Sequence, residues 1–107
     1  MTEMISLPDG TKIRHLSCQE ILRIEAAGSY AIIHFISREP FKCAKLLKEI
    51  IKKLNSKYFI KIHKSHVVNL KEVKEYERGR GGKVLMSDGS FVCVSVRKKC
   101  ELLRRLG

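Results

Sequence analysis

The sequence predicts an α+β domain that is mostly β, with short antiparallel strands and two helices. β-Branched and aromatic residues are concentrated in short runs, as they are in strands. Turn signals such as Pro8-Asp9-Gly10 and Ser87-Asp88-Gly89-Ser90 separate several of these runs. The length of 107 residues allows one modest core, so residues 1–107 are expected to form a single domain.

The first half of the chain predicts mainly strands. In order, we expect a hairpin at 5–13, a short helical turn at 18–21, and strands at 22–27, 30–36 and 41–43. Gly28-Ser29 separates the strands predicted at 22–27 and 30–36. The segment 30–36 is apolar on both faces, which predicts a central strand.

A helix is predicted for residues 44–54. Its apolar residues Leu47, Ile50, Ile51 and Leu54 follow the i, i+3, i+4, i+7 spacing of one helix face. Lysines occupy the other faces, which is typical of a solvated surface and is also compatible with DNA or membrane binding.

The second half predicts two hairpins and a final helix. Strands at 73–77 and 84–86 are joined by the loop Arg78-Gly-Arg-Gly-Gly, which lacks the strand-to-helix context and the lysine of a phosphate-binding loop. We therefore expect a flexible hairpin there, whose arginines could touch a backbone phosphate. A turn at 87–90 leads into a strand at 91–94.

The final helix is expected to begin at Ser95, which could cap it through its hydroxyl or contact DNA. Its predicted core-facing stripe consists of Val96, Cys100, Leu103 and Leu106.

The charge of the chain favours a polyanionic partner. Lys and Arg number 22 and Asp and Glu 11, which gives a formal net charge of +11 and a pI near 9.8. No apolar run approaches the roughly 20 residues of a membrane span, and the start does not resemble a signal peptide. The four cysteines have no paired spacing, which predicts reduced thiols and a cytoplasmic location, without membrane contact.

The stretch 59–73 is the strongest candidate for binding. Two similar triplets, Lys61-Ile62-His63 and Lys64-Ser65-His66, follow one another and precede the apolar pair Val67-Val68. Asn69 is predicted to be a turn residue, because asparagine tolerates the left-handed backbone. The pattern predicts a strand that ends in a compact turn, with lysine, serine and histidine held outward toward a polyanion.

This stretch resembles the hallmark of the LytTR family of DNA-binding domains, which is close to Phe-x-Arg-x-His-Arg-Ser-Tyr-x-Val-Asn. Residues 24–30, Ile-Glu-Ala-Ala-Gly-Ser-Tyr, are similar to the family's Ile-Glu-Ala-x-Gly-Asn-Tyr. Asp88-Gly89, Val94-Ser95 and Arg97 resemble the element near the domain's end. The resemblance covers nearly the whole chain, although Lys61, Lys64, His66 and Ser29 depart from the family's usual residues.

The resemblance implies an elongated domain that presents loops to successive major grooves of DNA. The candidates for base contacts are Tyr30, Ser29, Lys64 and Arg97. The candidates for phosphate contacts are Lys42, Ser65, Lys98 and Lys99. Structural support of the binding loop is expected from His63, Val68 and Asn69.

Other interpretations remain open for some of these residues. Tyr30 could instead be a strand-end aromatic residue in the core. A metal site at His63-x-x-His66 or His15-x-x-Cys18 lacks a second ligand pair, so we expect neither metal nor cofactor. A hydrolase built on Ser65 lacks an orienting acid, so we expect no enzyme. A basic RNA-binding module is the alternative function.

The resulting hypothesis is sequence-specific binding of double-stranded DNA for transcription regulation, as two copies on repeated half-sites. Relatives in this family are usually bacterial response regulators. They carry an N-terminal receiver domain, and the DNA-binding domain is their output domain. We expect no receiver domain in this chain, since 107 residues leave no room for one. The chain would then be a fragment of a longer regulator or a free-standing member of the family.

Overall fold

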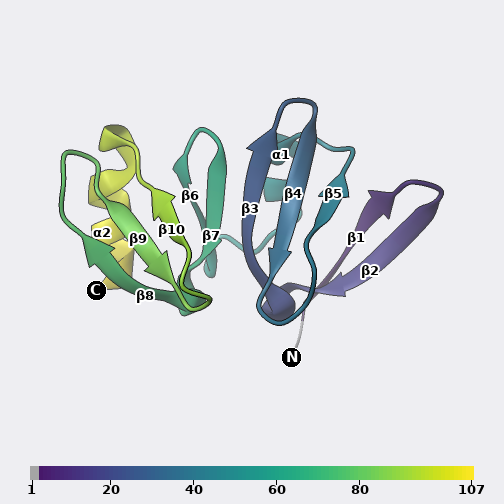
Figure 1. The fold of residues 1–107 in the computed structure, drawn as a ribbon, viewed down its shortest axis with the longest axis horizontal. Helices are drawn as coiled ribbons and strands as arrows, with labels where there is room; N and C mark the ends of the chain where they lie inside the picture. Colours follow the sequence, from purple (N-terminus) through teal and green to yellow (C-terminus); the bar gives the residue numbers. More distant parts are fainter. Residues whose placement is uncertain (1–2) are drawn as a thin grey trace.

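The computed structural model describes residues 3–107, which form three antiparallel sheets side by side (Figure 1). The strands are β1 (Met4–Asp9), β2 (Lys12–Ser17), β3 (Ile21–Ala27), β4 (Tyr30–Phe35), β5 (Phe41–Cys43), β6 (Phe59–His63), β7 (His66–Asn69), β8 (Val73–Glu77), β9 (Lys83–Met86) and β10 (Phe91–Cys93). The helices are α1 (Leu47–Ile51) and α2 (Lys99–Leu106), with short 3-10 turns η1 (Cys18–Glu20), η2 (Leu70–Glu72) and η3 (Val96–Lys98). The predicted mostly β fold is confirmed, and the extents of 42 × 32 × 24 Å make the domain elongated.

The five-stranded sheet, in the order β5-β4-β3-β7-β6, is the centre of the molecule. The hairpin β1–β2 lies beside β5, and the sheet β10-β9-β8 lies beyond β6 and β7 together with α2 (Figure 1). Within the described residues, neither helix is long and apolar enough to cross a membrane.

Two hydrophobic cores lie on opposite faces of the central sheet, because successive side chains of a strand point in opposite directions, and the second core covers only the part of its face near β6 and β7. Val67 belongs to the first core, whereas the next residue, Val68, belongs to the second. The first core includes Ile5 and Leu7 of the N-terminal hairpin and Ile50 of α1. The second core joins β6 and β7 to buried residues of the neighbouring sheet and of α2, namely Val84, Met86, Val92 and Leu102.

The helix predicted for 44–54 is much shorter than expected. α1 spans only Leu47–Ile51, and Leu46 before it has an extended backbone and makes no side-chain cap. Leucine has no oxygen to satisfy the first amide groups of a helix, so the helix begins late and depends on the packing of Leu47 and Ile50. The predicted apolar face is nevertheless the face that packs on the core.

The predicted stripe of the final helix is wrong. The chain first forms the 3-10 turn η3, and only Leu102 of α2 is fully buried, whereas Val96 and Leu103 are 54% and 39% exposed. A 3-10 turn has 3.0 residues per turn instead of 3.6, so it shifts the phase of the side chains that follow. Ser95 does not cap through its hydroxyl as expected; its backbone carbonyl accepts a hydrogen bond from the Lys98 amide at 3.0 Å.

The strand predicted for 30–36 is β4, but it is the second strand from the edge, and β3 is central. Ile36 lies outside the strand and is 39% exposed. Tyr30 at the start of β4 is 45% exposed, so it is not a core residue.

Candidate nucleic-acid interface

Two short hairpin turns lie next to each other at one edge of the central sheet (Figure 1). Ala27 pairs with Tyr30, which leaves Gly28-Ser29 as a two-residue turn, and His63 pairs with His66, which leaves Lys64-Ser65 as another. β3 and β7 are hydrogen-bonded neighbours, and the Ala26 amide donates to the Ser65 carbonyl at 2.8 Å. The two turns are therefore held in a fixed relation to each other.

Beside the first turn, strands β4 and β5 hold an aromatic ring and a cation together. Gly28 has φ +64°, a left-handed conformation that glycine adopts without strain and that suits a two-residue hairpin. Ser29 is exposed, and the Tyr30 ring lies with the Lys42 ammonium 5.2 Å from its centroid. The structure thus brings Tyr30, predicted for base contact, next to Lys42, predicted for phosphate.

The second turn is braced by His63. The Nδ1 atom of His63 accepts a hydrogen bond from the Ser65 amide at 3.1 Å, so the imidazole fixes the backbone of the turn. Lys64 points to solvent at the tip, and Ser65 is half-buried. Ile62 and Val68, on the two strands that the turn connects, are fully buried. The turn therefore holds an exposed cation on a hydrogen-bonded base.

Asn69 lies at the other end of β7 and is 3% exposed. Its side chain donates to the Ile21 carbonyl at 3.0 Å and accepts from the Lys71 amide at 3.0 Å. The expected left-handed backbone is not observed, because φ is −81° and ψ is 115°. Its bond to Ile21 ties β7 to β3, and its bond to Lys71 caps the 3-10 turn η2, so Asn69 has a structural role.

A third segment joins the β6–β7 turn from the C-terminal part of the chain. The Ser95 amide donates to the Ile62 carbonyl at 2.8 Å, so residues 95–98 lie beside β6. An open groove of about 370 Å³ separates the two segments. It is lined by Lys61, His63, Lys64, Ser95, Arg97 and Lys98, and so by four permanent cations and no carboxylate. We call the turns 28–29 and 64–65 and the segment 95–98 the loop edge.

One lysine predicted for phosphate contact lies away from the groove, and one lysine that was not predicted as a contact lines it. Lys99 does not line the groove; its ammonium lies 3.4 Å from the Gly79 carbonyl in the β8–β9 loop. Lys61, which was not among the predicted contact residues, lines the groove. Its position between the buried residues Ile60 and Ile62 is the alternation signal that could have identified it.

The sheet surface below the turns is also charged, but its charges are paired. Glu25 lies 3.6 Å from Arg23 and 3.1 Å from His34. Burial alone would raise the pKa of the Glu25 carboxyl, but the hydrogen bond with His34 and the charge of Arg23 outweigh it and hold the pKa below its usual value.

His66 lies opposite Glu25 on the neighbouring strand β7. It was expected to point outward, but it is half-buried, and its ring centroid lies 5.2 Å from that of His63. Burial is the main cause that lowers the pKa of His66, and the neighbouring imidazole of His63 adds to it. His66 is therefore a neutral part of the scaffold at neutral pH.

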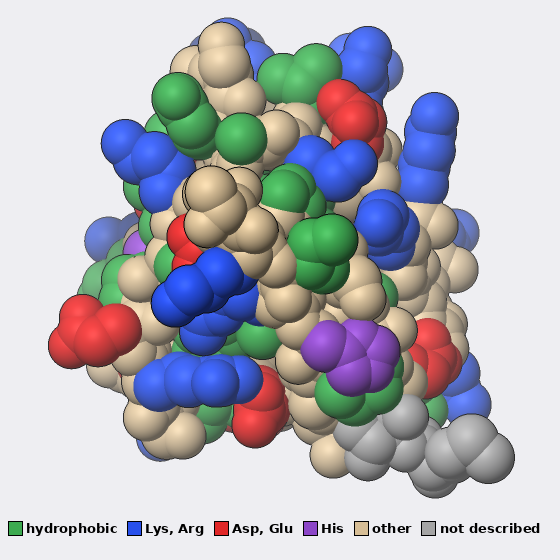
Figure 2. Space-filling model, turned by 90° about the vertical axis from the view of Figure 1, so that its right-hand side faces the viewer, with side chains coloured by type: hydrophobic (Ala, Val, Ile, Leu, Met, Phe, Trp, Pro, Cys, Tyr) green, Lys and Arg blue, Asp and Glu red, His purple; other side chains and the backbone are tan. Residues whose placement is uncertain are grey.

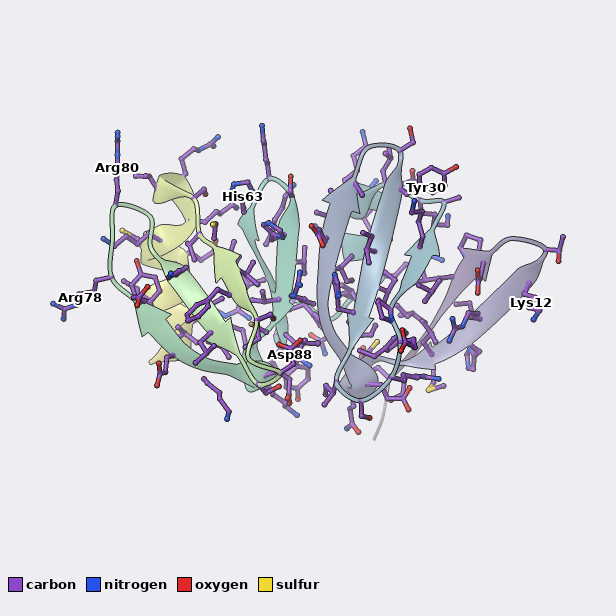
Figure 3. All side chains as sticks on the ribbon, viewed as in Figure 1. Lys12, Tyr30, His63, Arg78, Arg80 and Asp88 are labelled. Atoms are coloured by element: carbon purple, nitrogen blue, oxygen red, sulfur yellow. The ribbon has the colours of Figure 1, made fainter. Side chains whose placement is uncertain are left out.

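The side of the molecule formed by β1, β2 and β5 differs from the loop edge. Figure 2 shows lysines and arginines there interspersed with acidic side chains. Arg14, for example, lies 3.5 Å from Asp9 across the first hairpin. In Figure 3, Tyr30 and the region of His63 lie toward one edge of the domain, whereas Asp88 lies at the opposite edge. The carboxylate-free groove is therefore a local feature and not a consequence of the net charge alone.

Comparison with known proteins agrees with this picture. Residues 11–107 match the family described as the LytTr DNA-binding domain. The transcriptional regulatory protein LytR of Staphylococcus aureus, for example in strains N315 and COL, is 33% identical over 67 residues. That alignment covers 63% of this chain and 27% of LytR, so the chain spans about a quarter of the length of these curated relatives.

A solved LytTr DNA-binding domain from Bacillus cereus has the same fold, with a TM-score of 0.82 and 19% sequence identity. The superposition covers 97% of this chain and 96% of that chain. Since the family match extends over residues 11–107, the chain belongs to the LytTR family of DNA-binding domains.

Proposed function

We propose that the protein binds double-stranded DNA sequence-specifically through the loop edge and thereby regulates transcription. The observation that carries this proposal is the groove between the β6–β7 turn and residues 95–98, which has four cations and no carboxylate. Such a site favours the phosphate backbone of a nucleic acid, because each neutralised phosphate releases condensed counterions. The description of LytR as a transcriptional regulatory protein supports the regulatory role.

Arg97 and Lys64 are the residues to which we assign base reading. Both are exposed, and each comes from a different wall of the groove. Arginine and lysine suit the O6 and N7 acceptors of guanine in the major groove. In the first turn, the hydroxyl of Tyr30 or Ser29 would meet a base, while Lys42 would meet a phosphate beside it.

Lys61, Lys98 and Ser65 are assigned to backbone phosphates, which position the protein without reading the sequence. The long axis of the domain measures 42 Å. Successive major grooves on one face of B-DNA are about 34 Å apart, so loops spread along this axis are suited to neighbouring grooves.

The small number of exposed aromatic rings favours double-stranded DNA over single-stranded RNA as the ligand. Single-strand recognition depends on several exposed rings on which bases stack. Tyr30 is 45% exposed at the loop edge, and the exposed Phe91 has the Lys83 ammonium 4.5 Å above its ring. One ring at the edge is a poor stacking platform, whereas the cations suit a duplex backbone.

Duplex binding can be measured by fluorescence anisotropy over a range of salt concentrations. A site is first selected from a random duplex library, and a scrambled duplex and a single-stranded RNA of equal length serve as controls. Five or six phosphate contacts predict a slope of log K against log salt of about −5. A salt-independent affinity, or an equal preference for the RNA, would contradict the proposal.

We also propose that two copies bind repeated half-sites. A duplex with two selected half-sites about 10.5 base pairs apart should bind two copies, and more tightly than a duplex with one half-site. Native mass spectrometry or analytical ultracentrifugation of the complexes gives the stoichiometry. One copy per two-site duplex at saturation would exclude this arrangement.

A further inference from the structure

The β8–β9 loop, residues 78–82, was expected to be a flexible hairpin, but it is tied to its surroundings. The Tyr76 hydroxyl donates to the Gly81 carbonyl at 2.7 Å, and the Val94 amide donates to the Gly82 carbonyl at 3.0 Å. A Cβ atom on Gly81 would lie 2.0 Å from the Val94 carbonyl oxygen, so only glycine fits there. The loop is therefore fixed against the residue that precedes Ser95.

The same bonds make this loop a neighbour of the loop edge. Val94 leads directly into residues 95–98, and the Lys99 ammonium contacts the Gly79 carbonyl from the start of α2. Along the molecule, the order is then the turn 28–29, the turn 64–65, the segment 95–98 and the loop 78–82 (Figure 1).

The two arginines of this loop point in different directions. Figure 3 shows Arg80 projecting from the tip of the loop toward the same side as the β6–β7 turn, whereas Arg78 projects sideways, away from the rest of the domain. Both are exposed, and among the described residues neither has a hydrogen bond or an ion pair to another side chain. The carboxylate that precedes the loop, Glu77, is already paired with Lys83 at 3.0 Å.

We propose that the loop 78–82 is a fourth DNA-contacting segment, in which Arg80 binds a backbone phosphate beyond the one nearest to Arg97 and lengthens the bound segment at that end. This inference rests on the proposed function of the loop edge. A guanidinium is suited to a phosphate because it donates two parallel hydrogen bonds, and a rigid loop loses little entropy when it binds. A phosphate contact adds affinity on any sequence and adds no base preference.

The test compares Arg80→Ala with Arg78→Ala, which removes the same charge from the same loop. Affinity is measured on the selected and the scrambled duplex over a range of salt concentrations. Arg80→Ala should weaken binding to both duplexes by the same factor and reduce the salt slope by about one unit. Arg78→Ala should leave the slope near the wild-type value. Circular dichroism melts of both variants should match the wild type, because neither side chain is packed.

Shortened duplexes give an independent measurement. Base pairs are removed from each end in turn, and the loss of affinity is compared between the wild type and Arg80→Ala. At one end of the duplex, one truncation should lower the affinity of the wild type and leave the affinity of Arg80→Ala unchanged. The reason is that the truncation and the substitution remove the same contact.

The outcomes separate the two proposals. If the wild type binds duplex DNA with a steep salt slope, and Arg80→Ala behaves like Arg78→Ala in both measurements, this inference is wrong and the proposed function stands. If the wild type does not prefer duplex DNA at all, the proposed function fails, and this inference fails with it.

Discussion

The loop edge and the sheet surface below it use the same kinds of charged residue in opposite ways. On the sheet surface, Arg23 and His34 share the Glu25 carboxylate, and Arg23 is largely buried, with only 14% of its side chain exposed. At the loop edge, Lys64 and Arg97 are exposed around a groove that no carboxylate lines. Pairing keeps a cation of the sheet surface engaged within the fold, whereas an unpaired, exposed cation remains available to a ligand.

The hairpin β6–β7 joins these two regions, and the largest effect is expected for its apolar base. Val68 is fully buried in the second core beneath the turn. Val68→Asp places an unpaired carboxylate there and should cost at least about 4 kcal/mol, enough to unfold much of the domain. Val68→Ala, which only removes packing, should cost about 2 kcal/mol and remain folded. Chemical denaturation checks both values, and equal costs for the two variants would contradict the burial of this residue.

A smaller effect is expected when the paired surface loses its anion. Glu25→Gln removes the charge that Arg23 and His34 share. The Glu25 side chain is 36% exposed, so solvent screens the interaction and the loss of stability should be about 1 kcal/mol. Lys64→Ala serves as the matched change at the loop edge and should alter stability by less than about 0.5 kcal/mol. If Lys64→Ala were the more destabilising of the two, the contrast between the regions would be wrong.

The smallest effect is expected from titration of His66. Its pKa in the folded protein lies below the ordinary value of about 6.5, because the ring is half-buried beside His63. The unfolded chain therefore binds a proton more readily, so stability should fall as the pH drops from 7 through 6.5 toward the folded pKa. Denaturation at pH 7.5 and pH 5.5 measures this loss, which His66→Gln should reduce. If the stability of His66→Gln depended on pH as strongly as that of the wild type, the loss of stability would come from another histidine.

Much of this organisation could be predicted from local patterns. The hairpin turns at Gly28-Ser29 and at 87–90 follow from turn residues between β-forming runs, and the structure contains both. The exposure of Lys64 at the tip of its turn followed from the apolar residues on either side. The predictions were wrong where tertiary contacts determine the local structure. The 3-10 turn η3 rotates α2 so that Leu102 faces the core, and no periodicity within the helix reveals a shift that occurs before it.

The arrangement of the candidate site in space could be predicted less well from the sequence. Lys61 and Arg97 are 36 positions apart, and their segments are brought together by the hydrogen bond from the Ser95 amide to the Ile62 carbonyl and by the packing of β6 in the second core. The same is true of the β8–β9 loop. Its glycines suggested flexibility, but Gly81 is needed for close approach to Val94. Such contacts depend on the docking of one sheet against another, which local propensity does not specify.

The most direct test of the loop edge separates residues that read bases from residues that hold phosphates. Arg97→Ala and Lys64→Ala are compared with Lys98→Ala, a third cation of the same groove, each titrated on the selected and the scrambled duplex. Arg97→Ala and Lys64→Ala should each cost roughly 1–3 kcal/mol on the selected site and much less on scrambled DNA. Lys98→Ala should weaken both complexes equally and reduce the salt slope by about one unit. Equal weakening of both complexes by Arg97→Ala would contradict base reading by that residue.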